Sequence, residues 1–527
     1  MTALDTARRV ARSERPLGPV GLLVSAVICI AAALAAAVMP EGAAARWLLA
    51  GVIAVVLAFV CTRSTAQGVI VTFVWLFALG TTRRLASEVL ADPGRDPFLL
   101  VAPVAVAVLG LRALLAGALR RMTVLAWLVL AFSVLVLLQM ANPDNPSGFS
   151  RVAGLLVWLV PTLWFWVGRT LVDDRLARRL LYLVVGATTV VALYGIVQSV
   201  VDFPPWDQRW INHRGYAALY IGPVTVRPFG SYASAAEFGL ACAVGAIVAA
   251  TMAFGPSLLM HVTTDRRAAR RHRTQRTGIF LLALGMFLVT SLALVLSAIR
   301  TYLLLLVVAL PVVYLVMHGR KAWKVLIPAI LLVAVALAAL AQVDPNSFAK
   351  DGAQAGIRRV IVALNDPFAS NKDNTDSTLQ VHYDSAKAGV RQAFEHPIGH
   401  GTGSTGISGE HFGAKTTSSD FDISDAGIAF GVLGLFLAVA IVVVGLWSSI
   451  RVALSRRTFE RVALVGVLLV SIGAWFQGAH YVMAALLWLL LGRADAAFAK
   501  RHDVEPADDD AAVGAVRIDA TLPPARP

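Results

Sequence analysis

Charged residues and cysteines are both scarce in this chain of 527 residues. Only 15% of the residues are charged, and the three cysteines, Cys29, Cys61 and Cys242, all lie inside apolar stretches. Isolated cysteines of this kind exclude a disulfide framework and a cysteine-rich metal cluster, and they are typical of small core residues.

Apolar residues take the place of the missing charges. They make up 58% of the sequence, and the mean hydropathy is +0.72, whereas soluble domains are about 45–50% apolar. The composition therefore predicts an integral membrane protein with the lipid bilayer around it. Its net charge of +14 is explained by the basic loops that orient membrane proteins, so we expect no nucleic-acid partner.

The chain contains about fourteen apolar stretches of spanning length, because a helical span needs about 20 residues. They lie near residues 17–39, 46–62, 67–82, 98–115, 123–141, 152–170, 180–201, 231–254, 278–297, 300–317, 323–342, 425–449, 462–479 and 481–493. Three of these are short, so we expect an all-α, polytopic transmembrane helix bundle of about 12–14 spans. The first stretch is longer than the apolar part of a signal peptide and is expected to be retained, with a cleaved signal peptide as the alternative.

The basic residues predict the orientation of the bundle. Arginine and lysine recur in every second connection, from the N-terminal arginines to the six arginines between 266 and 276 and the group between 451 and 461. By the positive-inside rule, this alternation places both termini in the cytoplasm, in a multi-pass protein of the cytoplasmic (inner) membrane. One missed span would invert every later connection, so the unbroken alternation supports the span assignment.

The expected domain organisation follows from these spans. Residues 1–16 form a basic cytoplasmic N-terminus, 17–342 the first transmembrane helices with an extracytoplasmic loop near 202–230, 343–424 a large extracytoplasmic loop, 425–493 the C-terminal transmembrane helices, and 494–527 a disordered cytoplasmic tail. Long loops are usually functional, so the large outer loop is a candidate part of the active site. The tail is rich in Asp, Ala and Pro, a composition typical of disorder.

Arg300 stands between two apolar stretches at the predicted outer face of the membrane. A charge in such a place is costly in lipid and is usually kept because it faces a partner, often an anion. Arg227 lies in an outer loop of the same face. The alternative for Arg300 is a side chain that snorkels to the interface, and for Arg227 an ordinary anchor to lipid headgroups.

Several short motifs follow one another in the middle of the chain. In order, they are Tyr194-Gly195-Ile196-Val197-Gln198, Pro205-Trp206-Asp207-Gln208-Arg209-Trp210, Arg227-Pro228-Phe229-Gly230-Ser231-Tyr232, Ser297-Ala298-Ile299-Arg300, His396-Pro397-Ile398-Gly399-His400-Gly401-Thr402-Gly403 and Gly431-Val432-Leu433-Gly434. Their order, spacing and shared outer placement resemble the O-antigen ligase and O-antigen polymerase superfamily of bacterial envelopes. The resemblance covers roughly residues 180 to 440, with a compatible helix count elsewhere.

The resemblance implies a glycosyltransferase-like enzyme that moves glycan from an undecaprenyl diphosphate carrier to an acceptor hydroxyl outside the cell. It maps Arg227 and Arg300 onto the family's diphosphate-binding arginines. Arginine suits this role because its planar guanidinium meets phosphate oxygens in bidentate fashion and keeps its proton. A departing diphosphate needs such fixed positive charge as its own charge develops. The resemblance implies no metal, no nucleotide sugar and no other cofactor.

The late motif is a second candidate site. Residues Gly401 to Gly406 spell G-x-G-x-x-G, but no apolar strand precedes them, so a dinucleotide site is excluded. The backbone N–H groups of Gly401 and Gly403 could still point at a phosphate. The alternative is a tight turn. His396 and His400 flank a proline and glycines that argue against a helical zinc pair, and no further ligands complete a metal site.

The general base is the point at which the chain departs from the family. Ligases of the family carry a histidine shortly before the Gly-x-x-Gly span, where this chain has Asp420. Asp420 could act as the base if burial raised its pKa. His400, His411 or His382 could fold into that position instead. The alternative for Asp420 is a solvated surface carboxylate.

Other residues of the outer loops are weaker candidates. Arg209 and Arg214 share the first loop with Arg227 and could bind the diphosphate, or they could be solvated surface charges. His382 stands where many family members have an arginine, so it is also a candidate for binding substrate. Trp206 and Trp210 could stack on a sugar or anchor the loop at the interface.

We therefore expect a metal-independent polymerase of repeat units for a capsule, exopolysaccharide or O-antigen-like glycan. It would use an undecaprenyl-diphosphate-linked oligosaccharide and act beside other polysaccharide assembly proteins. The absence of the family histidine favours polymerase over the first alternative, a ligase that attaches glycan to a lipid or protein. The second alternative is a flippase or transporter for lipid-linked sugars, but its sites are expected at the membrane midplane rather than in outer loops.

Overall fold

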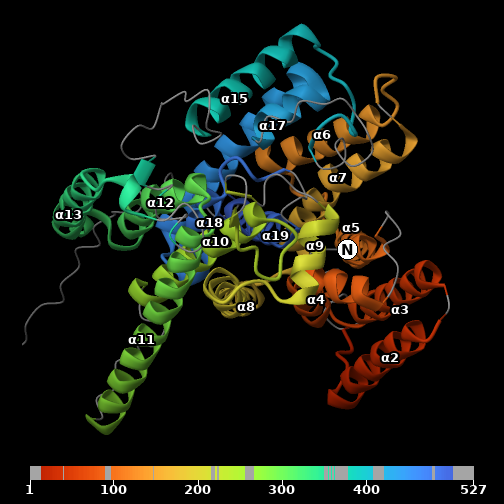
Figure 1. The fold of residues 1–527 in the computed structure, drawn as a ribbon, viewed down its shortest axis with the longest axis horizontal. Coiled ribbons are helices and arrows are strands. Elements are labelled where there is room, and N and C mark those ends of the chain that lie inside the picture. Colours follow the sequence, from red (N-terminus) through yellow and green to blue (C-terminus); the bar gives the residue numbers. More distant parts are fainter. Residues whose placement is uncertain are drawn as a thin grey trace, which may run out of the picture.

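The chain folds as a bundle of long α-helices (Figure 1). The computed structural model describes residues 14–39, 41–89, 96–145, 147–214, 220–221, 225–255, 266–348, 354, 358, 361–362, 378–406, 421–476 and 481–502. Its apolar helices are α2 (Pro19–Ala37), α3 (Gly42–Arg63), α4 (Thr65–Val89), α5 (Val101–Leu115), α6 (Val124–Gln139), α7 (Gly148–Leu171), α8 (Asp174–Val200), α10 (Ala235–Phe254), α11 (Arg266–Leu296), α12 (Arg300–His318), α13 (Trp323–Ala341), α17 (Asp422–Ser455), α18 (Phe459–Val470) and α19 (Tyr481–His502).

The connections between these helices hold shorter elements. They are the helices α9 (Pro205–Arg214) and α15 (Thr378–Glu395), the 3-10 turns η1 (Pro97–Leu100), η3 (Gly319–Ala322) and η4 (Pro345–Ser347), and the antiparallel pair β1 (Tyr220–Ile221) and β2 (Thr225–Val226). Helix α15 lies within the stretch 343–424, which the sequence predicts as the large extracytoplasmic loop. The fold class expected from the sequence is confirmed.

Eleven helical segments among the described residues are long and apolar enough to cross a membrane. The chain is therefore a multi-pass membrane protein. Three details differ from the predicted spans. The fifth stretch, 123–141, forms the helix Val124–Gln139, which is shorter than a span. The tenth and eleventh stretches join through η3 into one apolar segment, Arg300–Leu332. The thirteenth stretch, 462–479, is shorter than predicted because α18 ends at Val470, where a turn with Gly473 at φ +96° interrupts it.

Helix α10 forms the centre of the bundle. In its membrane-spanning window 83% of the residues are buried, against 6% in that of α2. Alanines and glycines make up half of its residues, and its main neighbours are α8, α11, α12 and α18. Small residues allow helices to approach closely in a membrane, where no hydrophobic force drives them together. The sequence of α10 thus explains its central place.

Helices α7 and α19 approach each other through glycine. A Cβ atom on Gly168 would lie 1.8 Å from the carbonyl oxygen of Leu489, and one on Gly492 would lie 1.9 Å from that of Phe165. Neither carbonyl can move without unfolding its helix locally. The contact therefore requires glycine at both positions.

The ion pairs agree with the predicted alternation of the two membrane faces. Arg169 Nε lies 2.7 Å from Asp495 Oδ2, and Arg178 Nε lies 3.2 Å from Glu460 Oε2, both between segments predicted inside. Arg84 pairs with Asp207, between segments predicted outside. Contacts of this kind would cross from one face to the other if the span count were wrong by one. Which face is cytoplasmic stays a prediction.

We predict that Gly168→Ala destabilises the protein, because the methyl group forces α7 away from α19. Overpacking of this kind costs about 1–3 kcal/mol. The thermal midpoint of the purified protein in detergent should fall, and less protein should accumulate in membranes. Gly186→Ala in α8 is the matched control, since a Cβ there would meet no atom within 4 Å. Equal midpoints for the two variants would contradict the close packing of α7 and α19.

Candidate functional site

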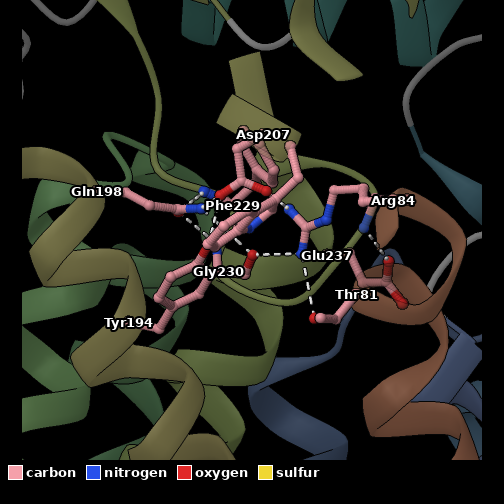
Figure 2. A network of polar contacts seen from close by, with 10 residues as sticks. Thr81, Arg84, Tyr194, Gln198, Asp207, Phe229, Gly230 and Glu237 are labelled. Carbon is pink, nitrogen blue, oxygen red and sulfur yellow. Dashed lines mark hydrogen bonds and ion pairs between the residues drawn. The ribbon is translucent and has the colours of Figure 1, made fainter. Parts of the chain in front are cut away.

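A buried ion pair between Arg84 and Asp207 lies at the predicted outer end of the bundle (Figure 2). Arg84 comes from the end of α4 and Asp207 from α9, and their side chains are 1% and 0% exposed. Arg84 Nη1 lies 2.9 Å from Asp207 Oδ1. Arg84 Nη2 donates to the carbonyl oxygen of Gly230 at 2.8 Å, and its guanidinium lies 4.9 Å from the ring centre of Phe229.

The second oxygen of Asp207 connects the ion pair to α8. It accepts hydrogen bonds of 2.6 Å from the hydroxyl of Tyr194 and from Nε2 of Gln198. The Oε1 atom of Gln198 in turn accepts from the backbone N–H groups of Phe229 and Gly230, at 3.1 and 2.8 Å. Three motifs identified in the sequence therefore meet in one polar network, which Figure 2 shows from close by.

Gly230 has to be glycine in this network. Its φ is +54°, a conformation that L side chains rarely adopt. A Cβ atom there would lie 2.6 Å from Val191 Cγ1 and 2.9 Å from the ring of Phe238. The conformation turns the carbonyl of Gly230 toward Arg84 and its N–H toward Gln198, so the polar network holds the backbone two and three residues after Arg227.

The segments of Arg227 and Arg300 come together at the same end of the bundle. Val226 and Ile299, the residues before the two arginines, pack against one apolar cluster formed by Trp210, Ile211, Phe229 and Ala235. Both arginine side chains are half-buried. The two arginines are 73 positions apart in sequence, and the fold brings the residues directly before them onto one cluster. Joint contact of the two guanidinium groups with a diphosphate stays a prediction.

A second ion cluster supports the same end. Asp96 lies between Arg83, whose Nε donates to Asp96 Oδ2 at 2.5 Å, and Arg46, whose Nε lies 4.0 Å from Oδ1. The guanidinium of Arg83 covers the ring of Trp210 at 5.1 Å. Arg83 and Arg84 are therefore buried structural cations. Like Arg300, both are charged residues at the end of an apolar stretch of the sequence.

The loop tryptophans belong to this framework as well. Trp210 is 4% exposed, which leaves its ring no open face for a sugar. Trp206 donates its indole N–H to the hydroxyl of Tyr194 at 3.1 Å. Both tryptophans thus hold α9 against α4 and α8.

The turn at His396–Gly406 is anchored by two other parts of the chain. The backbone N–H groups of His400 and Gly401 donate to the carbonyls of Ile428 and Ala429 in α17, at 3.0 and 2.9 Å. Asn142 and Asn145, from the connection between α6 and α7, bind the carbonyl of Gly399 and the N–H of Gly403, both at 2.9 Å. The sequence analysis did not single out these two asparagines, although both lie in a predicted outer connection.

The glycines of the turn serve close packing. A Cβ atom on Gly401 would lie 2.4 Å from the side chain of Asn145, and one on Gly403 would lie 2.6 Å from the backbone of Ser150. The N–H groups of both glycines already donate within the protein. This arrangement favours the tight turn over a phosphate cradle made by those two N–H groups.

A kink in α17 receives the turn. Gly431 has φ +68° and ψ −157° inside the helix, and the freed N–H of Val432 donates to the carbonyl of Pro397 at 3.2 Å. A Cβ atom on Gly431 would lie 1.9 Å from that same carbonyl oxygen. Gly431, the first glycine of the Gly-x-x-Gly pattern, therefore interrupts the helix. The turn at His396–Gly406 packs against this interruption.

His400 is the candidate base whose surroundings the structure describes. Its ring centre lies 4.5 Å from that of His396. Burial, and to a smaller extent the His396 imidazole, lower the pKa of His400 below its usual 6.5, against an opposite effect of Asp144. A lowered pKa keeps the imidazole neutral near pH 7, the form that can accept a proton.

The remaining predicted site residues are placed only in part. Asp420 and His411 lie outside the described residues. His382 lies in α15 and Arg214 at the end of α9, but their side chains fall outside the description. Arg209 lies in α9 and is exposed. Asp422, two residues after Asp420, is buried and accepts from the N–H of Phe476 at 2.7 Å.

Two further features bear on ligands. In the described part of the chain, no group of three or more His, Cys, Asp or Glu side chains could hold a metal ion. An apolar cavity of about 870 Å³ lies between α2 and α3 and is lined by residues such as Val24, Ile28, Trp47 and Phe59. None of the predicted site residues lines this cavity.

Comparison with known proteins adds no family to this description. No protein-family model matches the chain, and no curated protein matches it. The resemblance carried by the motifs therefore stays a prediction.

We predict that Arg84→Met destabilises the protein by about 3–5 kcal/mol, because it leaves Asp207 charged and buried without its partner. The double variant Arg84→Met/Asp207→Leu should recover much of that loss, since it removes both charges. The thermal midpoints of the two variants and of the wild type, in the same detergent, measure this difference. Arg320→Met, on an exposed residue of η3, is the control. A double variant less stable than Arg84→Met would contradict the assignment of the pair.

We predict that His400 makes stability depend on pH. Its pKa is lower in the folded protein than in the unfolded chain, so the unfolded chain binds the proton more tightly. The folded state should be most stable above pH 6.5 and lose stability as the pH falls from there through the folded pKa. In His400→Gln, the thermal midpoint should change less between pH 5 and pH 7 than it does in the wild type. A wild-type slope that persists in this variant would show that other groups cause it.

Proposed function

We propose that the chain is a metal-independent glycosyltransferase-like enzyme of the O-antigen ligase and polymerase type. It transfers glycan from an undecaprenyl-diphosphate-linked donor at the outer side of the cytoplasmic membrane. One observation carries the proposal: residues flanking Arg227 and Arg300 pack on a single apolar cluster, beside a polar network built from the motifs that suggested the family.

In this proposal, the two arginines bind the diphosphate of the donor. The acceptor hydroxyl attacks the anomeric carbon, and the bond from that carbon to the diphosphate oxygen breaks. The electron pair leaves with the diphosphate, where the two guanidinium groups stabilise the growing negative charge. The hydroxyl proton passes to a general base, for which His400, Asp420 and His411 are the candidates.

The orientation is part of the proposal. The alternation of basic connections supports a position outside the cytoplasm for Arg227, Arg300 and the turn at His396–Gly406. The ion pairs within each face support the alternation on which that placement rests. A carrier whose headgroup is at the outer surface of the bilayer would meet the arginines there.

We predict that Arg227→Ala and Arg300→Ala each abolish polymer in producing cells while the protein still accumulates in membranes. Arg→Lys at either position should be nearly as damaging, because the ammonium group cannot reproduce a bidentate phosphate contact. Immunoblots of membranes and electrophoresis of the cell-surface glycan measure the two quantities.

Arg320→Ala is the matched control, because Arg320 is exposed and lies at the opposite end of α12 from Arg300. It should leave the amount of polymer unchanged. A normal amount of polymer in cells with Arg300→Ala would contradict the proposal that Arg300 binds the diphosphate. The product pattern also separates the two enzyme types: loss of a polymerase leaves single repeats, and loss of a ligase leaves long chains unattached.

A further inference from the structure

Helix α15 lies beside the first part of α17, at the upper edge of the molecule in Figure 1. Its inner face is made of small residues: Gly389 and Ala393 are buried, and a Cβ on Gly427 of α17 would lie 3.0 Å from that of Ala393. The adjoining turn fixes the end of α15, because Pro397 accepts from Val432 at the kink. Helix α15 is therefore held at the same depth as the outermost turns of α17, which is a membrane span.

A stripe of large apolar side chains on α15 is exposed. Tyr383 is 61% exposed, Val390 38% and Phe394 64%, and Ile398 in the next turn is 75% exposed. Positions i, i+7 and i+11 fall on one side of a helix. These residues lie outside every membrane-spanning segment of the described chain, and exposed apolar patches of this kind mark a surface that binds something.

The stripe continues into the surface that α17 presents to lipid. Leu433 and Phe436, directly after the kink, are 54% and 65% exposed within the spanning segment. The hydrogen bond between Pro397 and Val432 places Ile398 next to that surface. One apolar surface thus runs from the lipid-facing side of α17 through Ile398 to Phe394.

Charge on α15 fits the same surroundings. Lys387 is exposed and lies within the stripe, four residues after Tyr383. Arg391, four residues further on, lies at the edge of the stripe, where its Nε donates to Glu395 Oε1 at 2.6 Å. Basic residues beside an apolar stripe are typical of helices that lie in a membrane interface among anionic headgroups. Ala388, on the far side of these cations, faces away from the stripe.

We propose that α15 lies in the headgroup region of the bilayer, with Tyr383, Val390, Phe394 and Ile398 inserted among the lipid chains. The occupant of this face is the lipid surface, not a second protein. The proposal does not depend on the enzymatic activity proposed above. Its consequence is that the turn at His396–Gly406 sits at the membrane surface.

Nitroxide labels on single cysteines test the proposal in the full chain. Val390→Cys and Phe394→Cys are made in a background with Cys29→Ala, Cys61→Ala and Cys242→Ala, and Ala388→Cys is the matched control on the polar side. The labelled proteins are reconstituted in vesicles of equal parts phosphatidylcholine and phosphatidylglycerol. Collisions with oxygen, which concentrates in lipid, are compared with collisions with a water-soluble nickel chelate.

We expect the ratio of oxygen to nickel collisions at positions 390 and 394 to exceed that at 388 several-fold. Equal ratios at the three positions would overturn the proposal, because the stripe would then face water. Labels at 390 and 394 that neither reagent reaches would overturn it as well, since protein would then cover the stripe. Oxygen-rich labels in an enzymatically inactive preparation would still support it, so the two proposals fail separately.

Discussion

The ion pair between Arg84 and Asp207 is the interaction on which the outer end of this bundle depends. Both charges are almost fully buried, and taking two charges out of water costs several kcal/mol for each ion unless their remaining hydrogen-bonding capacity is satisfied. Part of that capacity is satisfied here: Tyr194 and Gln198 donate to one carboxylate oxygen, and the carbonyl of Gly230 accepts from Nη2 of the guanidinium. Because these partners come from α8, α9 and the segment after Arg227, alternative positions of the outer loop would leave a buried charge unpaired.

This constraint links the fold to the proposed chemistry. The polar network fixes the backbone at Phe229 and Gly230, and the apolar cluster beneath it brings Val226 and Ile299 together. The turn at His396–Gly406 is held separately, by Asn142, Asn145 and the kink at Gly431. A transferase that binds a lipid diphosphate needs its cations preorganised before the leaving group gains charge. In the proposed enzyme, Gln198 would contribute to that order through its hydrogen bonds to Asp207, Phe229 and Gly230.

Much of this architecture was predictable from the sequence, because a membrane span is a local signal of about 20 apolar residues. Arg300 stood out for the same reason, as a charge between two such runs. The partners of Arg84 and Gln198 were not predictable: the pair Arg84–Asp207 joins residues far apart in sequence, and one sequence alone does not reveal which buried charges meet. Gly401 shows that the spacing of glycines alone does not identify a phosphate site, since the same spacing arises where a turn packs closely on Asn145. Asp420, outside the described residues, stays a prediction.

The most direct test of the account is the affinity of the purified protein for undecaprenyl diphosphate in phosphatidylcholine nanodiscs. We expect Arg227→Ala and Arg300→Ala each to raise the Kd at least about tenfold, which corresponds to about 1.4 kcal/mol. Because both arginines would bind the same diphosphate, we expect their effects in the double variant to be non-additive. An unchanged Kd in Arg300→Ala, or strictly additive effects of the two substitutions, would contradict a shared diphosphate site.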